Sequence, residues 1–367
     1  MEKFKKAFRG LVDPRASNAQ HELFEVLVIA LAAVLCGAKG PTDMALFGRS
    51  KERVLRQFLR LEHGVPSHDT FGRVFHALEP RAFEEAFRKF MAAFAKANGL
   101  NLTGVVAVDG KALCGAYERG KSATPLQMVN VFAAEARMVL AARKAPGRNE
   151  AKGAVDALRM LSLEGCIVTT DALHCHREFA ATVLGRGGDF ALALKRNQSK
   201  LFAGAARRFA RGGKRSVAKR LELSSHDRRE TRHATVIRDT SVAAASRFPG
   251  VVALGRITSR RRPHGGRAQK PLVRYFLLSK YIPAKRLLQT VRSHWGIENR
   301  LHWVLDVVFG EDGNRTRKDN SPENLAILRR LALNIIRCHP APTSMRQKIK
   351  RAGWDDAFLL DVLGHMR

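Results

Sequence analysis

The sequence predicts an α/β protein with a mixed five-stranded sheet flanked by helices, a helical N-terminal region and a β-rich insertion. Three observations predict this class. Apolar residues recur at helical spacing through residues 1–98, and strand-like, basic segments fill residues 201–285. Between them, residues 99–200 read as three strands, a helix, a strand, a helix and a strand. Strands joined by tight turns and then by helical crossovers form a sheet of mixed direction.

The N-terminal region, residues 1–98, is predicted to consist of helices. The apolar run from Leu23 to Cys36 contains a single charge, Glu25, and is too short to span a bilayer comfortably, so we expect a buried helix. A later helix carries four phenylalanines on one side, at positions 83, 87, 90 and 94. That spacing is typical of ordinary core packing.

The predicted core occupies residues 99–200 and resumes at 286–340. Its five strands are GVVAVDGKAL, MVNVFAAEA, MVLAARKA, CIVTTDAL and DFALALK. The insertion, residues 201–285, contains three further strand-like pieces and a loop rich in Gly, Pro and Arg. Residues 341–367 form a basic and then amphipathic tail.

The strongest global signal is charge. The 367 residues include 65 Lys and Arg against 33 Asp and Glu, a net charge of +32. Such a chain usually has a polyanionic partner, most often nucleic acid. An anionic membrane surface or a basic scaffold is the alternative, but scaffolds are poorer in apolar residues than this chain, which is 45% hydrophobic. Five scattered cysteines without a CxxC pair indicate reduced thiols in a cytoplasmic protein.

Two aspartates, Asp109 and Asp171, each end an apolar strand, VVAVD and CIVTTD. If these strands are neighbours, both carboxylates reach the same rim of the sheet. Their repulsion then requires a divalent cation or a shared proton. Carboxylate ligands favour Mg²⁺ or Mn²⁺. Two such ions, about 3.5–4 Å apart, are suited to phosphoryl transfer.

A third acid, Glu298, lies at helical spacing with Trp295 and Leu301, on an apolar stripe where a carboxylate needs a partner or a metal. Glu311 or Asp312 is the alternative third ligand, and Asp306 is a weaker candidate than either. Each main acid also has a simpler interpretation. Asp109 is then a turn residue before Gly110, Asp171 caps the next helix, and Glu298 is satisfied by an Arg or by a His such as His302.

These residues bring the chain to a known family. It resembles bacterial insertion-sequence transposases of the DDE class, in particular the H-repeat-associated group. The resemblance covers nearly the whole chain. It rests on HELFEVLVIALAAVLCGA, PSHDTFGRVF, VAVDGKAL, VTTDALHCH, DFALALKRNQ, HDRRETR and HWGIENRLHWVLDVVFGEDGNRTRKDNSPENLAILRRLALN.

The resemblance implies an RNase H-like core with its acids on the first strand, the fourth strand and a late helix, which match Asp109, Asp171 and Glu298. It implies a Mg²⁺-dependent transposase that cuts element ends and joins them to target DNA, acting as a homodimer on double-stranded DNA near the nucleoid. A nuclease that does not join strands, or an inactive DNA-binding relic, is the alternative. One departure stands out, because the helper Arg and Lys of the wider superfamily are replaced by His294 and Leu305.

We expect the helical N-terminal region, residues 1–98, to bind DNA. Further candidate DNA contacts are basic residues near the rim, in the insertion and around Glu298. The set is Lys111, Lys195, Arg196, Arg228, Arg229, Arg260, Arg261, Arg262, His294 and Arg300. Contacts of this kind hold the phosphate backbone without reading sequence. His174, Cys175 and His176 resemble a metal cluster, but no second pair stands at zinc spacing, so we expect no zinc site.

Overall fold

The structure is a computed structural model that describes residues 2–117, 124–195, 198–223, 229–263 and 266–366. Its centre is one mixed sheet in the order β3-β2-β1-β4-β5-β9-β8-β7-β6. The strands are β1 Gly104–Tyr117, β2 Pro125–Ala133, β3 Met138–Lys144, β4 Cys166–Thr170, β5 Asp189–Leu194, β6 Ser216–Leu223, β7 Arg229–Arg238, β8 Ala253–Arg262 and β9 Leu272–Leu278.

The first five strands form the expected core. β1, β2 and β3 pair as an antiparallel meander, while β4 and β5 run parallel to β1 on its other side. A helix lies between β3 and β4 and another between β4 and β5, because parallel neighbouring strands need a long connection. The predicted mixed α/β sheet is therefore confirmed, although the sheet has nine strands among the described residues and not the predicted five.

The insertion strands extend this same sheet. β9 pairs antiparallel with β5, placing Ala191 beside Leu278, so the edge of the core is covered. The sequence predicted three strands here but not β6, because the basic residues of β6 suggested only a charged segment. β6 is the outermost strand, and its Val217 and Leu221 are exposed.

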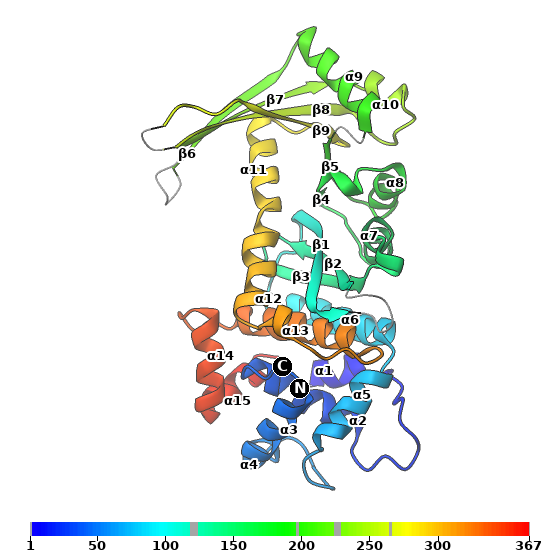
Figure 1. Ribbon diagram of the computed structural model, residues 1–367, viewed down its shortest axis with the longest axis vertical. Coiled ribbons are helices and arrows are strands. Elements are labelled where there is room, and N and C mark those ends of the chain that lie inside the picture. Colours follow the sequence, from blue (N-terminus) through cyan, green and yellow to red (C-terminus); the bar gives the residue numbers. More distant parts are fainter. Residues whose placement is uncertain (1, 118–123, 196–197, 224–228, 264–265, 367) are drawn as a thin grey trace.

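Helices cover both faces of the sheet (Figure 1). One face carries α7 Glu150–Leu158, α8 Arg177–Gly185, α9 Ser199–Ala210 and α10 Ser241–Ala244. The long helix α11, Ala284–His294, crosses the other face and contacts β6, β7, β8, β4 and β1. α11 therefore connects the insertion to the centre of the core, and the segment after His294 begins close to β1.

The helices at the N- and C-terminal ends pack together at the β3 end of the sheet (Figure 1). They are α1 Glu2–Phe8, α2 Leu23–Leu35, α3 Pro41–Ser50, α4 Glu52–Leu55, α5 His68–Ala77, α6 Pro80–Ala97, α13 Ser321–Cys338, α14 Met345–Trp354 and α15 Asp356–Gly364. The predicted helix α2 is buried, as are the four phenylalanines of α6.

α13 lies between these helices and the sheet, contacting α2, α5, α6 and β3. One continuous apolar core includes residues of α1, α2, α6, α13 and the adjacent face of β1–β3. The N-terminal helices and the core thus bury their apolar faces against each other. The division into 1–98, 99–200 with 286–340, 201–285 and 341–367 stays a prediction. Among the described residues, no helix is both long enough and apolar enough to cross a membrane.

Candidate active site

Asp109 and Asp171 stand side by side, although β1 continues to Tyr117, so Asp109 lies within its strand and not at its end as predicted. In the parallel pair of β1 and β4, Val108 lies beside Thr170, so Asp109 and Asp171 are the next residues on each strand. Asp109 accepts a hydrogen bond from the backbone N–H of Gly110 at 3.0 Å. Asp171 accepts one from Leu173 at 2.9 Å and so caps a short 3₁₀ turn. The capping interpretation of Asp171 therefore holds for this turn only, because the next helix, α8, is capped by His176. The second carboxylate oxygen of Asp171 stays outside this cap.

Glu298 reaches the same place from the segment after α11. It begins a π-helical turn, Glu298–His302, that runs into α12, Trp303–Val307. His302 Nδ1 lies 3.4 Å from Glu298 Oε2 and 3.9 Å from Asp109 Oδ2. Ligand-type atoms of Asp109, Glu298 and His302 all lie within 4.8 Å of one another. The fold thus brings Glu298 to Asp109, which also lies beside Asp171, although the three positions are far apart in the sequence.

The predicted apolar stripe was wrong at two of its positions. Leu301 and Leu305 are buried, but the side chains of Glu298 and Trp295 are 52% and 46% exposed. Ile297 is buried in their place. The regular stripe breaks because α11 ends at His294 with Trp295 as its C-cap, and the π-helical turn that follows closes each hydrogen bond over one more residue than an α-helix.

A buried polar chain fixes the orientation of His302. Arg330 donates to Asn130 Oδ1 at 2.6 Å, which turns the Asn130 amide nitrogen toward His302 Nε2, 3.4 Å away. Nε2 then accepts, so the ring proton sits on Nδ1 and donates to Glu298. His302 therefore acts as a positioning donor to Glu298 in this arrangement, although its place would also allow it to bind a cation.

The acids repel one another. The pKa of Asp109 is raised to about 7, first by burial and then by the negative charges of Glu298 and Asp171. The hydrogen bond from His302 is the largest influence on Glu298 and lowers its pKa. An oxygen-rich group of carboxylates that destabilise each other's charge fits a hard divalent cation. Asp109, Asp171 and Glu298 are the residues that would hold it.

The alternative third acids are engaged elsewhere. Glu311 is buried and pairs with Arg330 at 2.7 Å. Asp306 and Asp312 lie 2.7 Å and 3.0 Å from the ammonium of Lys111. These pairs give each of the three carboxylates a structural role.

Lys111 itself is buried, and its charge is shared by those two carboxylates. A contact between Lys111 and a DNA phosphate, as predicted, would require these ion pairs to open. His294 lies at the rim, with Nδ1 3.1 Å from Thr169 Oγ1. Burial lowers the pKa of His294 to about 4, so at neutral pH it offers no positive charge to a phosphate.

Of the other predicted contacts, Lys195 lies closest to the acids. Its ammonium is 3.8 Å from Asp171 Oδ2 and is largely exposed. Arg300 is exposed on the π-helical turn. The insertion set lies on paired β7 and β8, with Arg260, Arg261 and Arg262 about 19 Å and Arg229 about 24 Å across the sheet from β1. Arg196 and Arg228 lie outside the described residues.

Two residues at the site were missed as candidate active-site residues. Glu150, the first residue of α7, places Oε2 3.8 Å from His174 Nε2, and its charge also raises the pKa of Asp109. His174 lies 3.9 Å from Asp171 Oδ1 and is fully buried. The sequence offered only the helix start NEAK and the HCH triplet, and neither has a spacing that points to the acids.

Two regions of the chain match known families. Residues 5–91 match the family described as DDE_Tnp_1-associated. Residues 101–335 match the family described as Transposase DDE domain, which is well over half of the chain.

Curated relatives cover most of the chain. It is 29% identical over 355 residues to "H repeat-associated putative transposase YhhI" of Escherichia coli strain K12, covering 94% of this chain and 93% of that protein. It is 36% identical over 272 residues to "Uncharacterized protein in dhlA 3'region" of Xanthobacter autotrophicus, covering 71% and 90%. Among solved structures, a piggyBac transposase synaptic complex with hairpin DNA aligns at 12% identity and TM-score 0.41, covering 99% of this chain and 81% of that one. The match to the DDE domain contains Asp109, Asp171 and Glu298.

Proposed function

This chain belongs to the DDE transposases of insertion sequences, and from that premise we propose that it cuts the ends of its own element and joins them to target DNA at Asp109, Asp171 and Glu298. The observation that carries this proposal is the meeting of these acids at one rim of the sheet. Nuclease and transposition activity in general follow from the family. The assignment of these three residues as the catalytic set is our proposal.

We propose Mg²⁺, or Mn²⁺ in its place, as the cofactor, with two ions held by the three carboxylates. Bound there, the cations supply Lewis-acid stabilisation of the charge that develops on phosphodiester oxygens. The chain contributes placement. The N–H groups of Gly110 and Leu173 anchor Asp109 and Asp171, and His302 orients Glu298. Outer contacts of this kind hold ligands in a productive arrangement.

We propose double-stranded DNA as the partner, both the terminal inverted repeats of the element and its target. The support is the net charge of +32 together with the family. Joining requires two ends to be held together, so we expect a homodimer on DNA. We expect the protein to act in the cytoplasm, at the nucleoid.

The test is a cleavage and joining assay on duplexes taken from the ends of the DNA segment that carries the gene. Asp109→Asn, Asp171→Asn and Glu298→Gln should each abolish cleavage. Glu164→Gln is the matched control, because Glu164 is exposed just before β4, at the opposite end of that strand from Asp171. Full cleavage by any of the three variants would remove that residue from the proposal.

The same assay separates the alternatives. A wild-type protein that cuts without joining would be a nuclease. One that binds element ends and neither cuts nor joins would be an inactive relic.

A further inference from the structure

Helix α9 starts beside the acids and leads away from them. β5 ends at Leu194, and the next residue, Lys195, lies 3.8 Å from Asp171. The side chain of Gln198, just before α9, donates to the carbonyl of Cys175 at 2.7 Å. That bond ties the start of α9 to the segment that follows Asp171. A strand of DNA held at the acids would therefore pass close to the start of α9.

α9 has one apolar and one basic side. Leu201, Ala205 and Phe209 are buried, and Phe209 stacks on Tyr275 of β9 with ring centroids 5.7 Å apart. The exposed side carries Lys200, Arg207 and Arg211, seven and four residues apart. Those intervals are close to two turns and one turn, so the three charges lie in a row about 16 Å long.

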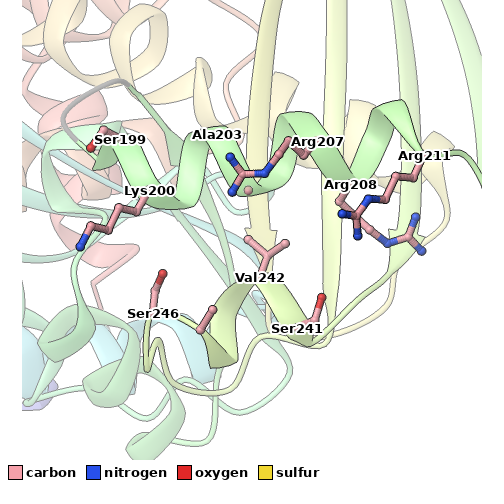
Figure 2. A pocket seen from close by; sticks show the side chains of 11 residues that line it. Ser199, Lys200, Ala203, Arg207, Arg208, Arg211, Ser241, Val242 and Ser246 are labelled. Atoms are coloured by element: carbon pink, nitrogen blue, oxygen red, sulfur yellow. The ribbon is translucent and has the colours of Figure 1, made fainter.

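A groove runs along this basic row, between α9 and α10 (Figure 2). Its volume is about 570 Å³, and the hydroxyl residues Ser199, Ser241 and Ser246 line it together with the basic side chains. Gly204 also lines the groove, and α9 packs closely on α10 there, because a Cβ atom at Gly204 would lie 3.0 Å from Val242 Cγ1. Figure 2 shows Lys200 near one end of the groove and Arg211 near the other.

One basic residue of the groove, Arg208, is paired with a carboxylate, and the other three basic residues have no such pair among the described residues. Arg208 is paired with Asp239 at 2.7 Å and also donates to the carbonyl of Gly212, so it holds α9 to the segment before α10. Within the described ranges, no carboxylate lies at ion-pair distance from Lys200, Arg207 or Arg211. A concave surface with three unneutralised cations and three hydroxyl groups matches the oxygens of a phosphate backbone.

We infer that the groove between α9 and α10 binds the phosphodiester backbone of the DNA whose strand is held at the acids. This rests on the proposed function. Each of the three cations suits one phosphate of a single strand. Cations and hydroxyls are the groups that contact the phosphate backbone, so we expect the groove to hold DNA in register without selecting its sequence.

The test is the salt dependence of DNA binding by the full chain. The probe is a fluorescein-labelled mixed-sequence duplex, measured by anisotropy, beside a duplex from the element end. Arg207→Gln with Arg211→Gln removes two phosphate contacts, so the slope of log K against log salt should fall in magnitude by about 1.8. Affinity for both duplexes should drop by the same factor. Lys200→Gln alone should lower the slope by about 0.9 and serves if the double variant melts early.

The control removes two exposed charges from α14, Arg346→Gln with Lys350→Gln. An unchanged slope in the groove variants, or an equal loss in the α14 variant, would overturn the groove as a specific DNA site. Cleavage of element-end duplex by the wild type is scored in parallel. If the wild type cleaves and the groove variants keep the wild-type salt slope, the groove proposal fails and the proposed function stands. If the groove variants have a smaller salt slope but the wild type does not cleave, the proposed function fails and the groove still binds DNA.

Discussion

Gly110 and Glu150 approach so closely that a β-carbon on Gly110 would lie 2.3 Å from Oε2 of Glu150. Gly110 follows Asp109 directly on β1. Glu150 is the first residue of α7, which packs on one face of the sheet that contains β1. The absence of a side chain at this one position therefore lets a fourth carboxylate stand beside the predicted acids.

Gly110→Ala should displace the Glu150 carboxylate and disturb the neighbouring Asp109. Because misplacement by about 1 Å can cost about 10²-fold in rate, we expect a loss of that order in cleavage. Gly185→Ala is the control, since nothing lies within 4 Å of a β-carbon at Gly185. Both variants should melt close to the wild type, and a wild-type cleavage rate in Gly110→Ala would contradict this role for the close approach.

Magnesium should stabilise the folded protein through the acids. Binding to the native state alone raises the free energy of unfolding by about 2.7 kcal/mol at a hundred times Kd. Asp109→Asn should lose most of this gain and should melt above the wild type in chelator, because the repulsion from Glu298 and Asp171 is relieved. Thermal denaturation across a MgCl₂ titration measures both effects, with Glu164→Gln as the control. An undiminished magnesium shift in Asp109→Asn would exclude Asp109 as a ligand.

Glu84 of α6 should make stability depend on pH. Burial raises its pKa to about 7 from 4.5, against the opposing pull of Arg143, whose Nη2 lies 3.6 Å away. Between pH 4.5 and 7 the folded state keeps a proton that the unfolded state has lost, so stability is fully present below pH 4.5 and falls as pH rises toward 7. The change in the pKa of Glu84 corresponds to about 3 kcal/mol in the free energy of unfolding.

Glu84→Gln should remove this dependence, so the variant gains stability relative to the wild type between pH 5 and pH 8. Melting temperatures across that range measure the difference. Glu85→Gln, on the next and exposed residue of α6, should not reproduce it. A constant difference between Glu84→Gln and the wild type would show that Glu84 does not titrate in this window.

The Arg330–Glu311 pair should behave as a buried structural pair. Both side chains are fully buried, and Glu311→Ala would leave the guanidinium without its carboxylate. Breaking such a pair costs about 3–5 kcal/mol, while replacing both members with apolar residues of similar volume is often neutral. Denaturant unfolding should therefore place Glu311→Ala far below the wild type and Glu311→Leu with Arg330→Met much nearer to it. Equal losses in the single and double variants would contradict this account.

What the sequence by itself determined was local. Apolar, β-branched runs predicted the five core strands, and helical periodicity predicted α2 and α6, because burial of one face depends on residues a few positions apart. The same runs predicted a strand end at both Asp109 and Asp171. β4 does end just before Asp171, but β1 continues through Asp109 to Tyr117, so that prediction was wrong for Asp109. The charge of +32 indicated DNA, and the family confirmed that class of partner.

The tertiary structure decided which residues meet. Glu150 and His174 join the acids because α7 and the segment after β4 pack over the same strand ends, and this proximity leaves no periodic trace in the sequence. The π-helical turn moved Glu298 out of the predicted buried stripe, and ion pairs across the fold engaged Lys111, Asp306 and Glu311. The physical reason is the same in each case. Helical and strand periods record only which face of an element is buried, whereas a site depends on contacts between elements that the chain brings together from distant positions.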